Sequence, residues 1–268
     1  MDFGIGSYTY ARMVEKCLND REAPVSVAKK LALTAAETGL GVVQICDNLP
    51  LHQISELELE QLGDYCLRFG VKLQIGTRGL GSEHLLRYLD IASLCGAKLV
   101  RTMCRDLYGN DVDVKTAVRD LSEVAGEYEK RGVFIAVENH DKNPSGELAD
   151  IIRTVSSGNI RLCLDTVNSF AVPETPELVI RNMLPYTINI HLKDFDIVRV
   201  NNQMGFSVEG RPLGEGRLKE YIEPLLNSDA HDAIIELWTP FSNDTESMVE
   251  LEKEWANKSI GFLKNFKV

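Results

Sequence analysis

The sequence predicts an α/β protein with a single (β/α)8 barrel, the TIM-barrel fold, over residues 1–268. Short apolar runs alternate with helix-like segments along the chain, which is the pattern of a parallel sheet covered by helices. Eight such runs are present, and eight is the number that closes a barrel. No Pro/Gly/Ser-rich linker or change in composition divides the 268 residues, so we expect one domain.

The predicted strands are compact and mostly β-branched, as expected of strands buried on both faces. In chain order they occupy residues 3–6, 42–46, 71–75, 99–103, 133–138, 160–165, 187–191 and 233–238. Glycines stand shortly before several of these runs, where a left-handed residue would end the preceding helix. These predicted helix ends are Gly39, Gly70, Gly96, Gly132 and Gly158.

Three helical segments have support of their own. Ser55-Glu-Leu-Glu58 matches a capping box and precedes apolar residues at three- and four-residue steps. The stretch 111–131 places its apolar side chains on one stripe, which should cover the sheet, and a final helix is expected over 246–263. The glycine-containing segment 195–216 is long for a connection, so we expect a mobile loop that closes over substrate.

Composition excludes several classes of protein. A formal net charge of -11 repels phosphate backbones and anionic lipids, so neither nucleic acid nor a membrane is an expected partner. The N-terminus has no basic segment followed by a long apolar one, and no apolar run is long enough to span a bilayer. The six cysteines have no C-x-x-C spacing, so we expect reduced, mostly buried thiols in a cytoplasmic protein.

Four of the predicted strands end in a residue that can bind a divalent metal: Glu138, Asp165, His191 and Glu236. Because the carboxyl ends of barrel strands converge, these side chains should meet at one site. They suit Mn²⁺ or Mg²⁺, and Co²⁺ or Zn²⁺ would also fit. A lone acid after a strand is more often a helix cap, and a lone histidine is usually just hydrogen-bonded. Four together favour one shared metal ion, which would relieve the repulsion between three carboxylates.

Five short motifs resemble the sugar phosphate isomerase/epimerase family, the xylose-isomerase-like TIM barrels. In chain order they are Val137-Glu-Asn-His140, Leu164-Asp165, Ile190-His-Leu-Lys-Asp194, Pro212-Leu-Gly-Glu-Gly216 and Ile235-Glu236. The resemblance implies that Glu138, Asp165, His191 and Glu236 hold one metal, and that both glutamates also act as bases on a small keto sugar or sugar acid. The implied reaction is isomerisation or epimerisation through a metal-stabilised enediolate. Family analogy also implies a homo-oligomer.

This chain departs from the epimerase pattern at two places. Epimerase-type relatives commonly have a histidine three residues after the Asp ligand, where this chain has Asn168, and their arginine after the His ligand has no clear match. Other strings, among them Gly4–Tyr10, Gly76–Gly79 and Cys163–Phe170, are similar to 3-oxo-isoapionate decarboxylases, which act on branched 3-oxo sugar acids. Losing CO₂ beside a metal-bound ketone yields the same enediolate as losing a proton. Decarboxylation is therefore the alternative reaction.

Polar residues near the strand ends are candidates for contact with substrate. Lys193, two residues after the His ligand, is a candidate catalytic residue. Arg78 and Arg101 could bind a substrate carboxylate or phosphate, or be ion-paired within the protein. His140 could donate a proton, or be an ordinary loop residue. Trp238 could stack on a sugar, or pack in the core. The predicted substrate-binding residues are Arg78, Arg101, His140, Asn168, Glu215 and Trp238.

Two functions of other classes stay open. The same superfamily includes apurinic endonucleases, which cluster zinc ions, but such sites use many histidines and this chain has five. Its negative charge also opposes DNA. The second is a catalytically silent barrel that binds sugar or serves as a scaffold. The presence of all four ligands in the sequence argues against it.

Overall fold

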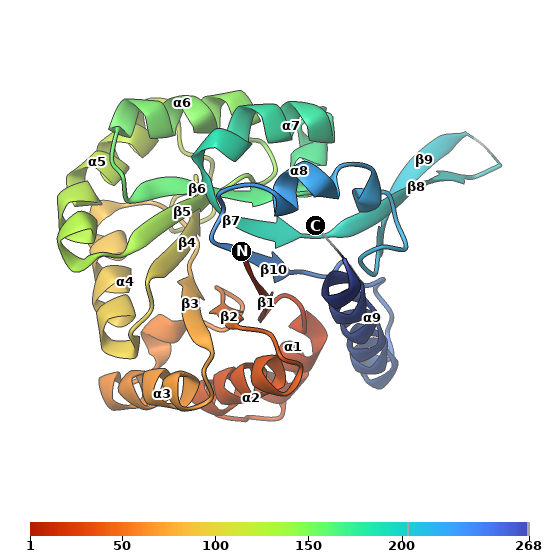
Figure 1. Ribbon diagram of the computed structural model, residues 1–268, viewed down its shortest axis with the longest axis horizontal. Helices are drawn as coiled ribbons and strands as arrows, with labels where there is room; N and C mark the ends of the chain where they lie inside the picture. The colour runs from red at the N-terminus through yellow and green to blue at the C-terminus, as the bar shows by residue number, and fades with distance from the viewer. Residues whose placement is uncertain (203, 267–268) are drawn as a thin grey trace.

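The computed structural model describes residues 1–202 and 204–266 and shows a closed barrel of eight parallel strands surrounded by helices (Figure 1). Around the barrel the strands follow the order β1-β10-β7-β6-β5-β4-β3-β2. They are β1 (Asp2–Gly6), β2 (Val42–Ile45), β3 (Lys72–Gly76), β4 (Leu99–Met103), β5 (Phe134–Glu138), β6 (Ile160–Asp165), β7 (Thr187–Leu192) and β10 (Asp232–Ile235). The predicted (β/α)8 fold is confirmed.

Helices cover the outside of the barrel. They are α1 (Ala11–Asn19), α2 (Pro24–Glu37), α3 (Glu56–Arg68), α4 (Ser82–Cys95), α5 (Val114–Arg131), α6 (Ser145–Val155), α7 (Pro176–Met183), α8 (Ile222–Leu226) and α9 (Thr245–Asn265), with short 3₁₀ turns η1 (Leu51–Gln53), η2 (Asn168–Ala171), η3 (Leu184–Tyr186) and η4 (Leu218–Glu220). The capping box at Ser55 is confirmed at the start of α3. The start predicted for α5 was too early, because Asp113 caps the first turn by accepting from Thr116 N–H.

Four of the five predicted helix-ending glycines adopt a positive φ: Gly39, Gly70, Gly96 and Gly132. The prediction for Gly158 was wrong. Helix α6 ends at Val155, and the next residue, Ser156, takes the left-handed conformation itself with φ of 54°. A serine accepts that conformation at some cost in strain, so the helix can end before the glycine is reached.

The segment expected to be a loop, 195–216, is largely a β-hairpin. Strand β8 (Asp194–Val200) pairs antiparallel with β9 (Gly205–Arg211), and the hairpin projects away from the barrel (Figure 1). Two glycines of this segment allow close packing: a Cβ on Gly210 would clash with the carbonyl oxygen of Trp238, and one on Gly216 would clash with Asp194 Oδ1. Gly210 and Gly216 therefore allow close packing at the base of the hairpin.

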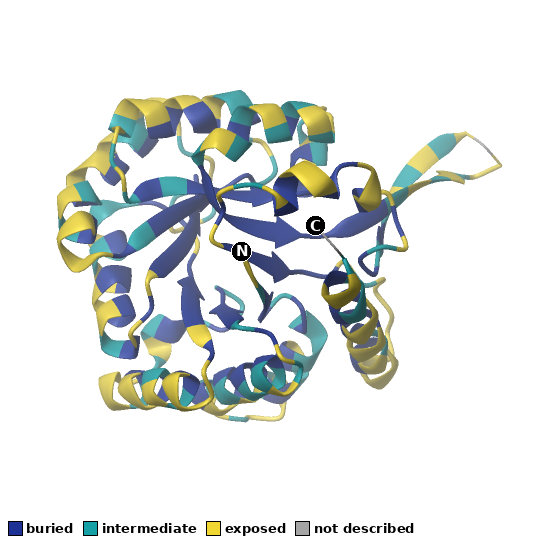
Figure 2. Ribbon diagram, viewed as in Figure 1, coloured by how far each residue is buried: buried dark blue, intermediate teal, exposed yellow. Residues whose placement is uncertain are grey.

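Most of the apolar core lies between the barrel and its helices (Figure 2). Side chains such as Leu31, Ile75 and Leu89 are fully buried there, and burial of each stabilises the fold by about 1.5–3 kcal/mol. Inside the barrel, a smaller apolar cluster is accompanied by polar side chains that are also buried, among them Gln44 and Asn189. Because buried polar groups need partners, this polar interior is a structural feature in its own right.

All six cysteines are buried and free, as predicted. Among the described residues, no helix combines the length and apolar character that crossing a bilayer requires.

Candidate metal centre and active site

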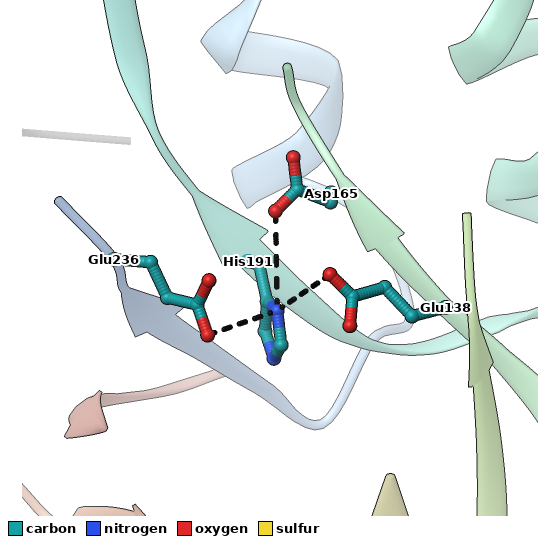
Figure 3. A group of neighbouring side chains, drawn as sticks. All are labelled: Glu138, Asp165, His191 and Glu236. Carbon is teal, nitrogen blue, oxygen red and sulfur yellow. Dashed lines mark ion pairs between the residues drawn. The ribbon is translucent and has the colours of Figure 1, made fainter. Parts of the chain in front are cut away.

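The four predicted ligands meet at the carboxyl ends of neighbouring barrel strands (Figure 3). Glu138 and Asp165 are the last residues of β5 and β6, His191 lies in β7 opposite Asp165, and Glu236 follows β10 directly. One ligand atom from each residue lies within 4.8 Å of the corresponding atoms of the others. The barrel thus brings together residues that are almost a hundred positions apart in the sequence.

The arrangement converges on the imidazole. Nδ1 of His191 lies 3.3 Å from Glu138 Oε1, 3.3 Å from Glu236 Oε1 and 4.0 Å from Asp165 Oδ2. All four side chains are buried. Neither His191 Nδ1 nor Glu236 Oε1 makes a hydrogen bond.

Buried acceptors without donors are costly, and three carboxylates around one imidazole repel one another. A divalent cation resolves both problems, because it neutralises the carboxylates and accepts the imidazole lone pair. The donor set therefore fits the predicted metal ion. Its three oxygens and one nitrogen would suit Mn²⁺ or Mg²⁺, and would also accept Co²⁺ or Zn²⁺.

Two buried cations flank the ligands. The Nζ atom of Lys193 lies 2.7 Å from Asp165 Oδ2 and 3.0 Å from Glu236 Oε2. On the other side, Arg101 forms an ion pair with Glu138 Oε2 through its Nε atom. Each cation thus uses a carboxylate oxygen of the ligand set, and together they hold the carboxylates in place.

The pKa values of the ligands reflect this crowding. Burial opposes ionisation of Glu138, but the charges of Arg101 and His191 outweigh it and hold its pKa below the usual range. Burial raises the pKa of Asp165, against the pull of Lys193. Burial disfavours the charged imidazole of His191, yet the two glutamates raise its pKa overall. The three carboxylates therefore repel one another when no cation is bound, as expected of a site that binds a cation.

Asn168 forms hydrogen bonds with both Glu138 and Lys193. Its Nδ2 donates to Glu138 Oε1 at 2.9 Å, and its Oδ1 accepts from Lys193 Nζ at 3.3 Å. The residue replaces the histidine of the epimerase pattern, so a neutral amide stands where a titratable ring was expected. It orients one carboxylate and one ammonium group without adding charge.

A further charged group, missed by the sequence analysis, lies beside Arg101. Asp47 accepts from Arg101 Nη1 at 3.0 Å, from Arg78 Nη2 at 3.0 Å and from the Tyr8 hydroxyl at 3.1 Å. Arg78 is the exposed member of this group, with 51% of its side chain accessible. Asp47 follows shortly after β2, so the same strand-end argument that identified the metal ligands would have found it.

Gln44 was also missed. Its Oε1 lies 2.8 Å from His191 Nε2, on the side of the ring that faces away from the carboxylates. Nothing in the sequence marked this residue, because a glutamine within an apolar strand has no characteristic spacing.

Three predicted substrate-binding residues are not brought into the cluster. His140 pairs with Asp141 at 3.0 Å, and Glu215 pairs with Lys258 of α9 at 3.1 Å. Trp238 is 42% exposed, and its backbone packs against Gly210 at the base of the hairpin. A cavity of about 1220 Å³ lies at the opposite, amino end of the barrel, where Asp232, Lys72 and Phe134 line it. It is separate from the ligand cluster.

Comparison with known proteins agrees with the fold. A family model described as the xylose isomerase-like TIM barrel matches residues 32–266. The chain therefore belongs to the xylose isomerase-like TIM barrel family, as the motifs in its sequence predicted.

Individual relatives differ in their reactions. The chain is 31% identical over 245 residues to 3-oxo-isoapionate decarboxylase from Pectobacterium atrosepticum, covering 90% of this chain and 88% of that protein. A crystal structure of D-psicose 3-epimerase in the presence of D-fructose has a TM-score of 0.69 at 15% identity and covers 98% of this chain and 97% of its own. The IOLI protein with a bound zinc atom has a TM-score of 0.67 at 17% identity, with full coverage of both chains. The two structural likenesses concern the fold alone.

Proposed function

We propose that this protein is a metal-dependent decarboxylase of a branched 3-oxo sugar acid. The charge balance of the site is the main support. The charged residues around the cluster are Asp47, Glu138, Asp165 and Glu236 against Arg78, Arg101 and Lys193. With a neutral His191 this set has one excess negative charge, so a divalent metal would leave one excess positive charge. Such a site favours an ionised carboxylate over a neutral ketose.

The reaction would break the bond between the carboxylate carbon and its neighbour. The electron pair moves to the adjacent ketone oxygen and forms an enediolate, and CO₂ leaves. When bound by Glu138, Asp165, His191 and Glu236, a divalent metal would supply positive charge that stabilises the negative charge developing on the substrate. Arg78, as the exposed cation, would attract and orient the substrate carboxylate.

One proton must then be delivered to the carbon that lost CO₂. We assign this step to Lys193 Nζ, a buried ammonium group that forms ion pairs with Asp165 and Glu236. Burial lowers the pKa of Lys193, but the charges of these carboxylates outweigh it and raise that pKa. A divalent metal held by the same carboxylates would lower the pKa again and so make the proton available. Glu138 and Glu236 would act mainly as metal ligands. Decarboxylation needs one proton transfer at carbon, whereas epimerisation needs two.

Epimerisation or isomerisation of a small keto sugar is the second candidate. It is favoured by the placement of Glu138 and Glu236 on either side of His191 (Figure 3), as two opposed bases would require. Against it, Arg101 forms an ion pair with Glu138 and reduces the ability of that carboxylate to take a proton from carbon. The decarboxylase is also the relative with the higher sequence identity.

One experiment separates these reactions. The metal-free protein is reconstituted with Mn²⁺ and incubated in D₂O with a branched 3-oxo sugar acid and, separately, with a set of ketoses. We expect metal-dependent release of CO₂ from the acid and no deuterium next to the carbonyl of the ketoses. Deuterium in a ketose without CO₂ from the acid would replace our proposal with the epimerase. Absence of both reactions in protein that binds Mn²⁺ would point to a catalytically silent barrel.

The residue assignments need a matched pair of variants. Glu236→Gln should abolish metal-dependent CO₂ release, because it removes a charged ligand of the cluster. Glu220→Gln makes the same chemical change at an exposed side chain that pairs with Arg217 outside the cluster, and it should leave turnover within about twofold of wild type. Equal effects of the two substitutions would contradict the site.

We further propose that Mn²⁺ or Mg²⁺ is the metal used, and that the enzyme works in the cytoplasm as a homo-oligomer on a small carbohydrate acid. The six unpaired thiols support a reducing compartment. Activity measured across Mn²⁺, Mg²⁺, Co²⁺ and Zn²⁺ tests the first point. Light scattering on the purified protein tests the assembly, and a monomer would refute it.

A further inference from the structure

The polar interior of the barrel forms a continuous chain of hydrogen bonds from the metal centre to the amino end. We call it the amide relay, and it consists of Gln44, Gln74, Asn189 and Asp232. All four side chains are at most 6% exposed. They come from strands β2, β3, β7 and β10, and the strand register places Gln44 beside Gln74 and Asn189 beside Asp232.

Each step of the relay has a donor and an acceptor. Gln44 Nε2 donates to Gln74 Oε1 at 3.0 Å and to Asn189 Oδ1 at 3.1 Å. Asn189 Nδ2 donates to Gln74 Oε1 at 3.2 Å. Gln74 Nε2 then donates to Asp232 Oδ2 at 2.7 Å. The last member is a carboxylate, which accepts hydrogen bonds and cannot donate them when ionised.

That carboxylate gives the relay one direction. Because Asp232 accepts, Gln74 must turn its amide nitrogen toward the amino end and its oxygen toward Gln44 and Asn189. Gln44 must then use its nitrogen for these two neighbours, which leaves its oxygen for His191. Turning the Gln44 amide around would place its oxygen about 3 Å from two other oxygens, an arrangement that is repulsive.

The direction of the relay determines which nitrogen of His191 is available. An acceptor 2.8 Å from Nε2 requires that Nε2 carry the proton. Nδ1, which faces Glu138 and Glu236, then has the lone pair that a metal needs. Partners that fix a ligand histidine in this way commonly govern metal affinity.

We infer that Asp232 and the amides of Gln74 and Gln44 are positioning residues that keep Nδ1 of His191 free for the metal. Asp232 lies four residues before Glu236 and pairs in register with Asn189. Asn189 in turn lies two residues before His191 on β7, which places it one layer further from the metal centre inside the barrel. It acts on the metal centre only through the relay. The inference rests on the metal centre of the proposed function and makes no use of the reaction catalysed there.

Two variants and one control test the relay. Gln44→Met removes the acceptor at His191 Nε2, and Asp232→Asn replaces the fixed acceptor by a group that can also donate. Thr102→Val is the control, because it removes a buried hydrogen bond of the barrel, from Thr102 Oγ1 to Gly79 O at 2.6 Å, that has no part in the relay. Thermal unfolding of all three establishes that the variants fold.

Calorimetric titration of the metal-free proteins with Mn²⁺ gives the first readout. We expect the dissociation constant to rise about 10- to 100-fold in Gln44→Met. It should rise roughly three- to tenfold in Asp232→Asn, since that variant weakens the direction of the relay without breaking it. Thr102→Val should stay within about twofold of wild type. An affinity for Mn²⁺ that is unchanged in Asp232→Asn overturns the inference.

NMR of the Zn²⁺-loaded protein, labelled with ¹⁵N at histidine, gives the second readout, which a general loss of stability would not alter. Wild type should show a hydrogen-bonded Nε2 proton on His191. Its resonance should shift in Asp232→Asn and stay in place in Thr102→Val. A metal-bound His191 that carries its proton on Nδ1 in wild type would also overturn the inference. Failure of wild type to bind any metal would instead refute the metal centre itself, and the relay with it.

Discussion

Replacement of Arg101 by methionine should destabilise the metal-free protein far more than the metal-loaded one. Arg101 is 3% exposed and forms ion pairs with Glu138 and Asp47. Asp47 keeps Arg78 and the Tyr8 hydroxyl as partners, so the main loss falls on Glu138, which is fully buried.

The size of the effect follows from the contact. Two unit charges about 3 Å apart attract one another by roughly 5 kcal/mol at an effective dielectric constant of about 20. Removing one partner of a buried pair typically costs about 3–5 kcal/mol, because the other charge stays buried without compensation. We therefore expect Arg101→Met to lower the free energy of unfolding of the metal-free protein by about 3–5 kcal/mol.

Saturating Mn²⁺ should reduce this deficit to less than half, because the cation takes over the neutralisation of Glu138. By thermodynamic linkage the variant should then bind Mn²⁺ about 100-fold more tightly than wild type, a difference of about 2.7 kcal/mol. Urea unfolding with and without Mn²⁺ measures both quantities. Arg119→Met is the matched control, since its arginine is 62% exposed and its substitution should leave the unfolding curve close to that of wild type with and without Mn²⁺. A deficit of equal size in the presence and absence of Mn²⁺ would refute the reasoning.

Three further predictions concern other parts of the molecule. Lys193→Met should lower the rate of CO₂ release by about 10²- to 10⁴-fold. Lys193→Arg should be equally slow, because guanidinium does not give up a proton at neutral pH. Wild-type activity in the arginine variant would show that Lys193 supplies only positive charge. Burial raises the pKa of Glu252 to about 7, against the backbone N–H groups of Arg12 and Met13. The folded state thus holds the Glu252 proton more tightly than the unfolded chain does. The contribution of this proton to the free energy of unfolding is therefore fully present below about pH 4.5 and is lost as the pH rises through 7. Glu252→Gln should therefore gain stability relative to wild type between pH 5 and 8 in thermal melts, and a constant difference would contradict the assignment. Asp113→Ala removes the N-cap of α5 and should lower the free energy of unfolding in urea by about 1 kcal/mol, with no change in Mn²⁺ affinity.

The barrel and the cluster of Glu138, Asp165, His191 and Glu236 were predictable because both depend on local patterns. A β-branched run identifies a strand wherever it stands, and the fold then forces every strand end to one face of the barrel. Four ligand-type residues at such ends had to converge, whatever the details of their side chains. The sequence could not show which partner each would choose, which is why Glu215 was expected at the site and is paired with Lys258 instead.

The hairpin and the amide relay show where local patterns stop being informative. Strands β8 and β9 do alternate polar and apolar residues, but each is short, and the glycines of β9 resemble those of a flexible loop until the close contact of Gly210 with Trp238 is known. No sequence pattern relates Gln44 to Asp232, which lie far apart in the chain. They are connected only because β2 and β10 lie in the same closed barrel, and this long-range pairing is a property of the fold as a whole.

Anomalous scattering from crystals grown with Mn²⁺ tests the central claim most directly. The structure leads us to expect one manganese peak per chain, bound by His191 Nδ1 together with carboxylate oxygens of Glu138, Asp165 and Glu236. Absence of a peak among these four side chains would contradict the proposed chemistry. Several metal peaks in one chain would instead favour an endonuclease-like centre.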